Sequence, residues 1–320
     1  MEPKFFQKLF WKDKLQSAWY LRTQLLDFEV TNAFRVIHGE GDGISGLIID
    51  YYDKNWVIQA HSTGVFLQMK EIAEAIQSNF PDFCDTIYCK SAGTLPNTGT
   101  DYFLFGTKAD TVAKENNILF SVNWVEGQKT GFFLDQRENR KLLGEFSKGK
   151  KVLNTFCYTG GFSIYAMNAG AELVTSVDIS QKAVDLAASN MELNFPKANH
   201  TAVADDVFNF MREHTQHYDV IVLDPPAFAK SIKSKHTATQ AYKRLNIAGL
   251  KALAPNGILF TFSCSQVIDD VLFYNTVAAA AIESGRNIRV LHKLGQGPDH
   301  PTNIYHPEGH YLKGLVLFVE

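Results

Sequence analysis

Short apolar runs alternate with helical patterns over the second half of the chain, from about residue 150. The apolar runs lie at residues 152–156, 173–177, 200–204, 220–223, 257–262, 288–291 and 311–319. Helical spacing of apolar residues is found at residues 162–167, 181–193, 207–214, 239–253 and 266–283. Strands that alternate with helices are typical of a parallel sheet with helices on both faces. The pattern therefore predicts an α/β domain with a doubly wound, mostly parallel sheet.

The first 125 residues show a different order of elements. An aromatic-rich helical pattern extends to about residue 30, and a second helix is predicted near residues 68–77. Strands are predicted within residues 35–52, around a glycine-rich turn, and at residues 56–60, 87–89 and 118–124. Gly and Pro punctuate residues 91–100, which predicts a loop. We therefore predict a smaller α+β domain at residues 1–125 and a second domain at residues 126–320, with residues 127–131 leading into the second.

The composition narrows the class of protein. With 320 residues, 45% of them hydrophobic and 20% charged, the chain is long enough for two globular domains. The N-terminus has scattered charges and no apolar core, and no run of about 18 apolar residues occurs, so neither a signal peptide nor a membrane span is predicted. Cys84, Cys89, Cys157 and Cys264 lack zinc-ligand spacing. We expect a cytoplasmic protein with free thiols and no metal site.

Residues 151–180 read as a strand, a glycine turn, a helix and a second strand. Gly160 and Gly161 lie in the turn, and Asp178 ends the second strand. A carboxylate at that position can accept both hydroxyls of an adenosine ribose, and the glycines would let the backbone approach the ligand. The dinucleotide signature GxGxxG is absent, so no pyrophosphate cradle is predicted. S-adenosylmethionine is the adenosine ligand that fits; the alternative is an ordinary strand-to-helix turn.

Two carboxylates, Asp205 and Asp206, separate the third strand of this domain from a helix. A carboxylate there can accept a hydrogen bond from the adenine amino group. The amphipathic pattern of the helix favours Asp206 over Asp205 for this contact. Capping of the helix N-terminus is an equally good interpretation, and the two roles do not exclude each other.

The next two strands end in residues with candidate chemistry. Asp224, Pro225, Pro226 and Phe228 follow one strand, and Cys264, between two serines, follows the next. Ligands of open α/β sheets bind outside the carboxyl ends of the strands, so both segments are predicted to face the site. Phe228 could stack on a flipped nucleobase, and a thiolate at this edge could act as a nucleophile. A buried, inert cysteine is the alternative for Cys264.

A basic stretch lies beside these residues. No Asp or Glu occurs from Pro225 to Ile268, whereas the whole chain has a net charge of −3. Such a local excess of cations suits contact with a phosphate backbone, although a solvated loop would show the same composition. The cations of this stretch are Lys230, Lys233, Lys235, Lys243, Arg244 and Lys251.

Residues 127–137, with the sequence GQKTGFFLDQR, precede the first strand of the predicted sheet. Their polar side chains between glycines suggest a lid over the cofactor or substrate. The alternative is the start of a helix with Arg137 and Arg140 on its solvated face.

Taken together, these motifs resemble the bacterial large-subunit ribosomal RNA methyltransferases that modify carbon 5 of cytosine. The matching pieces are residues 38–50, 127–137, 152–163, 176–180, 205–208, 222–231, 260–265 and 306–314. The resemblance implies a Rossmann-like class I methyltransferase domain, with a mostly parallel sheet whose last strand is antiparallel, and an N-terminal domain that grips RNA. Members of this family usually begin with an RNA-binding module of the PUA type, which we expect this chain to lack.

The resemblance also implies roles for residues in these motifs. Cys264 would add to carbon 6 of the cytosine, and Asp224 would hold the ring nitrogen and amino edge. The expected substrate-binding residues are Pro225, Pro226, Phe228, Lys230, Lys233, Lys235 and Arg244. The expected cofactor-binding residues are Phe133, Gln136, Arg137, Asn154, Phe156, Thr159, Gly160, Gly161, Asp178, Asp205, Asp206, Val207 and Asp224.

Two other functions remain open at this point. One is an RNA guanine or amino-group methyltransferase without covalent catalysis; against it stand Cys264 and Ala227, which separates Pro226 from the aromatic residue. The other is a non-catalytic RNA-binding assembly factor. We expect RNA, specifically large-subunit ribosomal RNA, as the partner, no membrane association, and a homodimer as one possible assembly.

Overall fold

The computed structural model describes residues 3–229 and 231–320, with side chains from Leu9 onward; Lys230 lies outside the described residues. The chain forms two compact units. The first consists of Met1–Arg137 and Gly297–Gly309, and the second of Glu138–Gln296 and His310–Glu320. The boundary predicted at residues 125/126 therefore lies at Arg137/Glu138. The return of Gly297–Gly309 to the first unit was not predicted, because no local pattern marks it.

The first unit contains a five-stranded sheet in the order β1-β2-β3-β4-β5. Only the β3–β4 pair is parallel. Strands β6 and β7 form a separate hairpin. The elements are α1 (Pro3–Leu25), β1 (Ala33–His38), β2 (Leu47–Tyr52), β3 (Asn55–Ala60), α2 (Thr63–Phe66), α3 (Met69–Asn79), β4 (Thr86–Lys90), β5 (Asp101–Phe105), β6 (Asp110–Glu115) and β7 (Ile118–Asn123), with short 3-10 turns η1 (Gly39–Asp42), η2 (Pro81–Phe83), η3 (Leu134–Gln136) and η5 (Pro307–Gly309).

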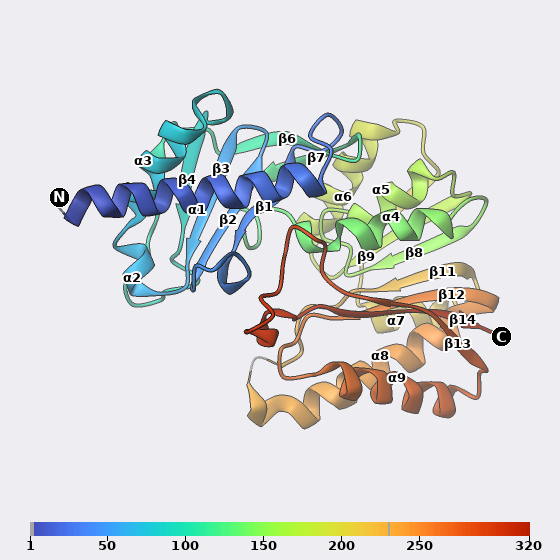
Figure 1. The fold of residues 1–320 in the computed structure, drawn as a ribbon. Coiled ribbons are helices and arrows are strands. Elements are labelled where there is room, and N and C mark those ends of the chain that lie inside the picture. The colour runs from blue at the N-terminus through green and yellow to red at the C-terminus, as the bar shows by residue number, and fades with distance from the viewer. Residues whose placement is uncertain (1–2, 230) are drawn as a thin grey trace. The chain divides into compact units, whose positions relative to one another are not determined.

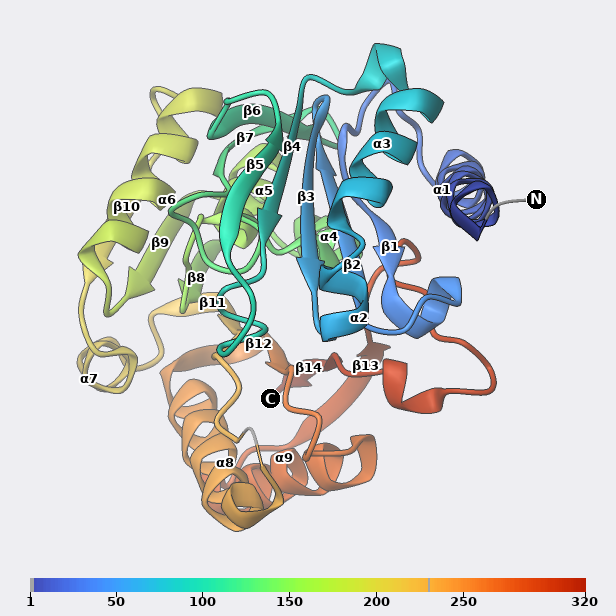
Figure 2. The same cartoon turned by 90° about the vertical axis from the view of Figure 1, so that its left-hand side faces the viewer.

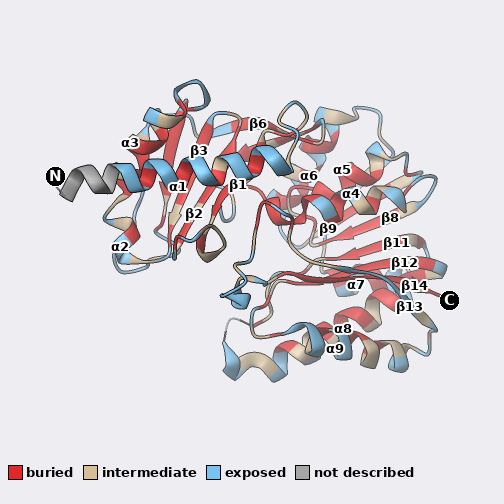
Figure 3. Ribbon diagram, viewed as in Figure 1, coloured by how far each residue is buried: buried red, intermediate tan, exposed pale blue. Residues whose placement is uncertain are grey.

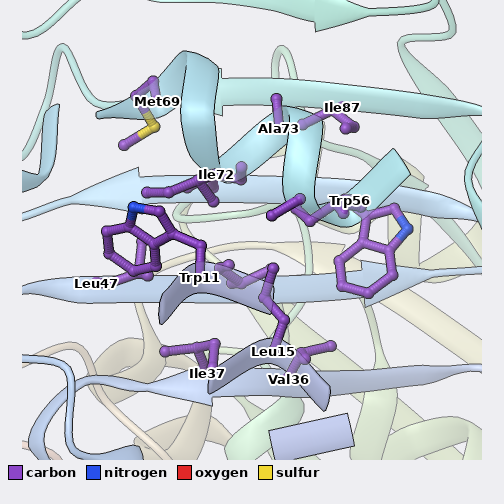
Figure 4. Packing of buried hydrophobic residues seen from close by; sticks show 14 of the residues in the cluster. Trp11, Leu15, Val36, Ile37, Leu47, Trp56, Met69, Ile72, Ala73 and Ile87 are labelled. Carbon is purple, nitrogen blue, oxygen red and sulfur yellow. The ribbon is translucent and has the colours of Figure 1, made fainter. Parts of the chain in front are cut away.

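Helices α1 and α3 pack on the same face of this sheet (Figure 2). Trp11, Leu15 and Ala18 recur at helical spacing on α1, and Met69, Ile72 and Ile76 do so on α3, so each helix presents one apolar stripe to the strands. Figure 4 shows Trp11 and Leu15 lying over Val36, Ile37 and Leu47 of the strands. Burial of these stripes, at roughly 25 cal/mol per Å² of apolar surface, is what holds α1 to the sheet.

The second unit contains a seven-stranded sheet in the order β10-β9-β8-β11-β12-β14-β13, and each apolar run predicted for it forms one of the strands. Neighbouring strands are parallel except where β14 pairs with β12 and β13. The elements are α4 (Arg137–Glu145), β8 (Lys151–Thr155), α5 (Gly161–Asn168), β9 (Leu173–Asp178), α6 (Gln181–Asn194), β10 (His200–Ala204), α7 (Val207–Glu213), β11 (Tyr218–Leu223), η4 (Ile232–Ser234), α8 (Lys235–Ala252), β12 (Leu253–Ser263), α9 (Asp270–Ser284), β13 (Ile288–Leu294) and β14 (Lys313–Val319).

Helices cover both faces of this sheet, which confirms the predicted doubly wound α/β fold. Figure 1 shows α4, α5 and α6 on one face and α7, α8 and α9 on the other. The central strands β8, β11 and β12 are buried between these layers (Figure 3). The strand order reverses between β8 and β11, and this switch point at the carboxyl ends of parallel strands is where ligands of such sheets bind.

Among the helices formed by residues 3–229 and 231–320, none is both long and apolar enough to cross a membrane.

Candidate active site

The turn between β8 and α5 is held in an unusual backbone conformation. Phe156, Tyr158 and Gly160 have φ angles of 53°, 44° and 75°. Two of these three residues are not glycine, and each costs of order 1 kcal/mol in the left-handed region. The surrounding structure enforces the turn: the Cys157 N–H donates to the Val177 carbonyl at 3.1 Å, and the Gly160 N–H to the Cys157 carbonyl at 2.8 Å.

Gly160 and Gly161 are required for packing inside the protein. A Cβ at Gly160 would lie 3.0 Å from the Cβ of Ala187 on α6, and one at Gly161 would lie 2.9 Å from the Cδ of Arg140 on α4. The glycines therefore let α6 and Arg140 approach the turn, a reason different from the ligand approach that the sequence suggested. Their part in cofactor binding stays a prediction.

Asp178, at the end of β9, fastens this turn. One carboxylate oxygen accepts the Tyr158 N–H at 3.2 Å, and the other accepts the Ser180 N–H at 2.9 Å. A carboxylate oxygen has two lone pairs, so each can accept a further hydrogen bond. Asp178 is half-buried at the sheet edge, and these two bonds fix its orientation. Its remaining lone pairs could accept hydrogen bonds from two ribose hydroxyls.

Asn154 and Thr159, both predicted cofactor ligands, have internal roles. The Asn154 amide donates to the Ser163 hydroxyl at 2.9 Å, which is 2.6 Å from the Ser176 hydroxyl. Ser176 in turn is 2.8 Å from Nε2 of His200, whose pKa burial lowers to about 4. The Thr159 carbonyl accepts the Asn190 amide at 3.0 Å. Asn154 therefore ties β8 to α5, and no contact of its buried side chain points to a cofactor role.

Asp206 caps α7, as the alternative interpretation predicted: its carboxylate accepts the Asn209 N–H at 3.0 Å. Asp205 accepts the Asp206 N–H at 2.7 Å with its side chain, and its own N–H donates to the Asp178 carbonyl at 3.1 Å. The next residue, Val207, is buried. The ends of β9 and β10 are therefore linked, while contact with adenine stays a prediction for both carboxylates.

Asp224 and Cys264 follow the neighbouring parallel strands β11 and β12, whose last pair in register is Leu223 with Thr261. The Ser265 hydroxyl donates to the Ala229 carbonyl at 2.8 Å and so joins the two segments. Asp224 and Cys264 are both half-buried, whereas Cys84, Cys89 and Cys157 are buried. Burial raises the pKa of all three buried thiols, to about 11 for Cys84, which leaves Cys264 as the candidate nucleophile.

The prolines and Phe228 of this loop differ in exposure. Pro225 is buried and Pro226 is exposed. Phe228 is half-buried, and its ring centroid lies 4.7 Å from that of Tyr242 on α8. The ring therefore belongs partly to the hydrophobic core, which was not expected of a residue predicted to stack on a nucleobase.

The basic stretch has acidic neighbours that the sequence did not indicate. Lys235 lies 3.6 Å from Asp269, and Lys243 lies 2.7 Å from Glu283, because α9 packs beside α8. Lys233 is exposed on η4, and Arg244 is exposed on α8, where it lines a groove of about 590 Å³ with Arg212 and Lys251. Lys233 and Arg244 are thus the better-supported cations for RNA contact.

The segment at residues 127–137 is more buried than expected. Arg137 is enclosed in the first unit, where its guanidinium nitrogens lie 3.1 and 2.6 Å from the Asp299 carboxylate. Arg140 is buried in the second unit and lies 6.0 Å from the Tyr165 ring. The alternative interpretation, a helix start with Arg137 and Arg140 on a solvated face, is therefore wrong about the exposure of both arginines.

The other two cofactor candidates of this segment also have protein neighbours. Gln136 is buried, and the Phe133 ring has the Lys129 ammonium 4.3 Å from its centroid. Cofactor binding by Phe133, Gln136 and Arg137 stays a prediction, and a guanidinium paired with a carboxylate is a poor candidate for it.

Sequence reasoning singled out neither Tyr242 nor Lys313, which both lie behind the site. The Tyr242 hydroxyl is buried without a partner at bonding geometry; burial raises its pKa to about 12, although Ser263 and the Phe228 backbone, both nearby, act to lower it. Lys313 is buried, and its ammonium donates to the Ser265 and Tyr311 carbonyls. A lysine at the start of the apolar run GLVLFV was the signal that could have identified it.

Comparison with known proteins bears on this site. A sequence profile of S-adenosylmethionine-dependent methyltransferases matches residues 96–307. Ribosomal RNA large subunit methyltransferase I of Aeromonas hydrophila is 39% identical over 313 residues, which cover 95% of this chain and 79% of that protein.

Two solved structures have the same arrangement of elements. A Streptococcus mutans protein assigned to the SAM-dependent methyltransferases has a TM-score of 0.86 at 26% identity, over 97% of this chain and 81% of that one. A protein assigned as a methyltransferase and determined in complex with SAH has a TM-score of 0.85 at 27% identity, with the same coverage of 97% and 81%.

Proposed function

The chain belongs to the family of S-adenosylmethionine-dependent methyltransferases that includes ribosomal RNA large subunit methyltransferase I, and from that premise we propose that it methylates carbon 5 of a cytosine in large-subunit ribosomal RNA. The observation that carries the choice of base is Cys264, a half-exposed thiol at the end of the strand next to Asp224. A methyltransferase acting on a nitrogen has no need of a nucleophilic side chain at that position.

The cofactor of this family is S-adenosylmethionine, which supplies an electrophilic methyl group when bound. The residues at the switch point fit it. Asp178 is fixed by two backbone N–H groups and retains acceptor capacity on both oxygens, which suits a ribose diol. Asp205 and Asp206 stand at the next strand end for the adenine edge. The sequence of the β8–α5 turn lacks the GxGxxG signature of dinucleotide sites.

Cys264 would perform covalent catalysis. Carbon 5 of cytosine is a weak nucleophile, but a bond between the Cys264 sulfur and carbon 6 turns the ring into an enamine, whose carbon 5 is reactive. After carbon 5 has gained the methyl group, loss of its proton and cleavage of the carbon–sulfur bond restore the aromatic ring and release the thiolate. The greater exposure of Cys264 among the four cysteines supports this role.

Asp224 would hold the base during this reaction. It follows β11 directly, and the Pro225-Pro226 pair stiffens the loop behind it. A protonated carboxyl group at the ring nitrogen and amino edge of cytosine can donate its proton to the ring nitrogen as the sulfur adds, because the electron pair displaced from the double bond moves onto that nitrogen. RNA would be held in part by the exposed cations Lys233 and Arg244.

The test is a covalent trap with an RNA fragment that carries 5-fluorocytosine at the target position, incubated with the full chain and S-adenosylmethionine. Fluorine at carbon 5 cannot leave as a proton does, so the adduct persists and migrates slowly in a denaturing gel. We expect the adduct from the wild-type protein and from Cys84→Ala, a buried cysteine of the first unit, and none from Cys264→Ala.

The rival functions give other results. A guanine or amino-group methyltransferase would form no adduct, and Cys264→Ala would keep its activity. A non-catalytic assembly factor would bind no S-adenosylmethionine in calorimetry. Either result would contradict the proposal that the protein methylates carbon 5 of cytosine.

A further inference from the structure

The turn that carries Cys264 is fastened on two sides. On one side the Ser265 hydroxyl donates to the Ala229 carbonyl at 2.8 Å, which ties the turn to the loop that follows Asp224. On the other side the Lys313 ammonium donates to the Ser265 carbonyl at 2.7 Å and to the Tyr311 carbonyl at 2.7 Å. The Ser265 carbonyl also accepts the Ile268 N–H at 3.2 Å. Cys264 therefore sits in a turn whose backbone is set by Lys313.

Lys313 occupies a buried position at which a charged side chain is energetically unfavourable. It is 3% exposed and lies on β14 opposite Ser263 of β12, in a strand whose other residues are apolar. Burial of an ammonium in such surroundings is unfavourable unless other charges compensate. Burial lowers the pKa of Lys313, whereas Asp270, Cys264 and Asp269 act to raise it. Lys313 pairs in register with Ser263 and its ammonium bonds to the Ser265 carbonyl, so it contacts the residues on both sides of Cys264.

Several charged and titratable groups surround the turn. They are Asp224 after β11, Tyr242 on α8, Asp269 and Asp270 at the start of α9, Lys293 on β13, and His310 before β14. Asp269 is itself paired with Lys235, and Asp270 is 3.5 Å from His310. Among the described groups that act on this turn, Lys313 is the cation that bonds to its backbone.

We propose that Lys313 is a positioning residue that fixes the Cys264 turn and stabilises the Cys264 thiolate with its positive charge. This inference rests on the proposed role of Cys264 and adds how the thiolate is formed. The interaction between an ammonium and a thiolate is mutual, so a thiolate that favours the protonated lysine is favoured by it in return. A thiolate population near neutral pH is what nucleophilic addition requires.

The test measures alkylation of Cys264 by iodoacetamide as a function of pH, with the modified residue identified by mass spectrometry on the full chain. Cys84, Cys89 and Cys157 are buried, so Cys264 is the thiol that reacts under native conditions. We expect a midpoint below the value of about 8.5 for free cysteine. In Lys313→Met the midpoint should rise by about one pH unit, which slows alkylation at pH 7 by about tenfold.

Two variants separate charge from packing. Lys313→Arg keeps a cation and its donors and should restore most of the wild-type profile. Lys293→Met removes a lysine that lines the same pocket of about 270 Å³ as Lys313 but that has no bond to the turn, and it should leave the profile unchanged. A merely structural Lys313 would alter the melting temperature of Lys313→Met and leave the midpoint where it is.

Two results would overturn the proposal. One is a Lys313→Met midpoint equal to that of the wild type. The other is a wild-type midpoint at or above about 8.5. This second measurement needs no variant, so it remains possible if Lys313→Met does not fold. Alkylation requires no methyl transfer, so the proposal is separable from the reaction. If Lys313→Met shifts the midpoint but no adduct with 5-fluorocytosine forms, the proposed cytosine reaction is wrong and the role of Lys313 stands. If the adduct forms but Lys313→Met leaves the midpoint unchanged, the role of Lys313 is wrong and the cytosine reaction stands.

Discussion

Asp178 has a structural role in addition to the ribose contact proposed for it. Its two carboxylate oxygens accept hydrogen bonds from the N–H groups of Tyr158 and Ser180. The first of these bonds supports a turn with two non-glycine residues at positive φ. Any change at Asp178 therefore affects the shape of the turn as well as the number of acceptors offered to the cofactor.

Asp178→Ala should raise the Kd for S-adenosylmethionine by at least about 30-fold, which corresponds to about 2 kcal/mol, because charge-assisted hydrogen bonds to two hydroxyls are lost. Calorimetry on the purified variant measures this. Asp185→Ala is the matched control, since Asp185 is exposed on α6 and bonds to Gln181. Equal affinity in the Asp178 variant, with an unchanged melting temperature, would mean that the ribose contact is misplaced.

Residues at strand ends were the ones whose placement the sequence could predict. Asp178, Asp224 and Cys264 follow apolar runs, and the geometry of a parallel sheet brings the ends of such runs to one edge. The surroundings of Arg137 and Lys313 could not be predicted, because their partners lie far away in sequence: Asp299 is 162 residues from Arg137, and Ser265 is 48 residues from Lys313.

At the scale of elements, the β8–α5 turn depends on how closely α6 approaches it. Gly160 combines a φ of 75° with an Ala187 Cβ that would lie 3.0 Å from any added Cβ. Gly149, before β8, has a similar φ of 68° but nothing within 4 Å. The two glycines therefore share a backbone requirement and differ in packing.

Gly160→Ala should destabilise the second unit by about 2–4 kcal/mol, from the left-handed backbone and the contact with Ala187 together. Gly149→Ala should cost only about 1 kcal/mol, because the backbone term alone remains. Urea unfolding followed by circular dichroism measures both. An equal loss of unfolding free energy in the two variants would show that α6 can move to accommodate the extra methyl group without an energetic penalty.

The sequence analysis predicted neither strand β5 (Asp101–Phe105) nor strand β6 (Asp110–Glu115), and the reason is clearest in β6. Its buried positions are Thr111, Ala113 and Glu115, whereas Val112 is exposed. The sequence DTVAKE has no apolar–polar alternation, and its two apolar residues, Val112 and Ala113, differ in burial, so the pattern does not mark an inner face. In the large sheet, the central parallel strands β8, β9 and β11 were predicted because they are buried on both faces, so their apolar runs are nearly continuous.

At the scale of the molecule, several histidines are held neutral. Burial lowers the pKa of His38 to about 2 and that of His200 to about 4, and it also lowers the pKa of His300. The unfolded chain takes up these protons near pH 6.5, while the native chain takes them up only at lower pH. Stability from these groups is therefore complete above pH 6.5 and is lost as the pH falls below it.

We expect the free energy of unfolding of the first unit to fall between pH 7 and pH 5, by at most about 1.4 kcal/mol per pH unit for each histidine. All four tryptophans lie in this unit, so their fluorescence during urea unfolding reports on it. His38→Gln should reduce the slope, and His236→Gln, a change at an exposed residue of α8, should not. A flat wild-type profile over this range would contradict the expectation.

The segment Gly297–Gly309 leaves the second unit and returns to the first, where Asp299 receives the Arg137 guanidinium. The chain therefore passes between the units at three points. A cut of the chain at the Arg137/Glu138 boundary would separate the two parts of the first unit and leave the buried Arg137 guanidinium without its counter-charge Asp299. An N-terminal fragment that ends at Arg137 would therefore lack part of the unit to which Arg137 belongs.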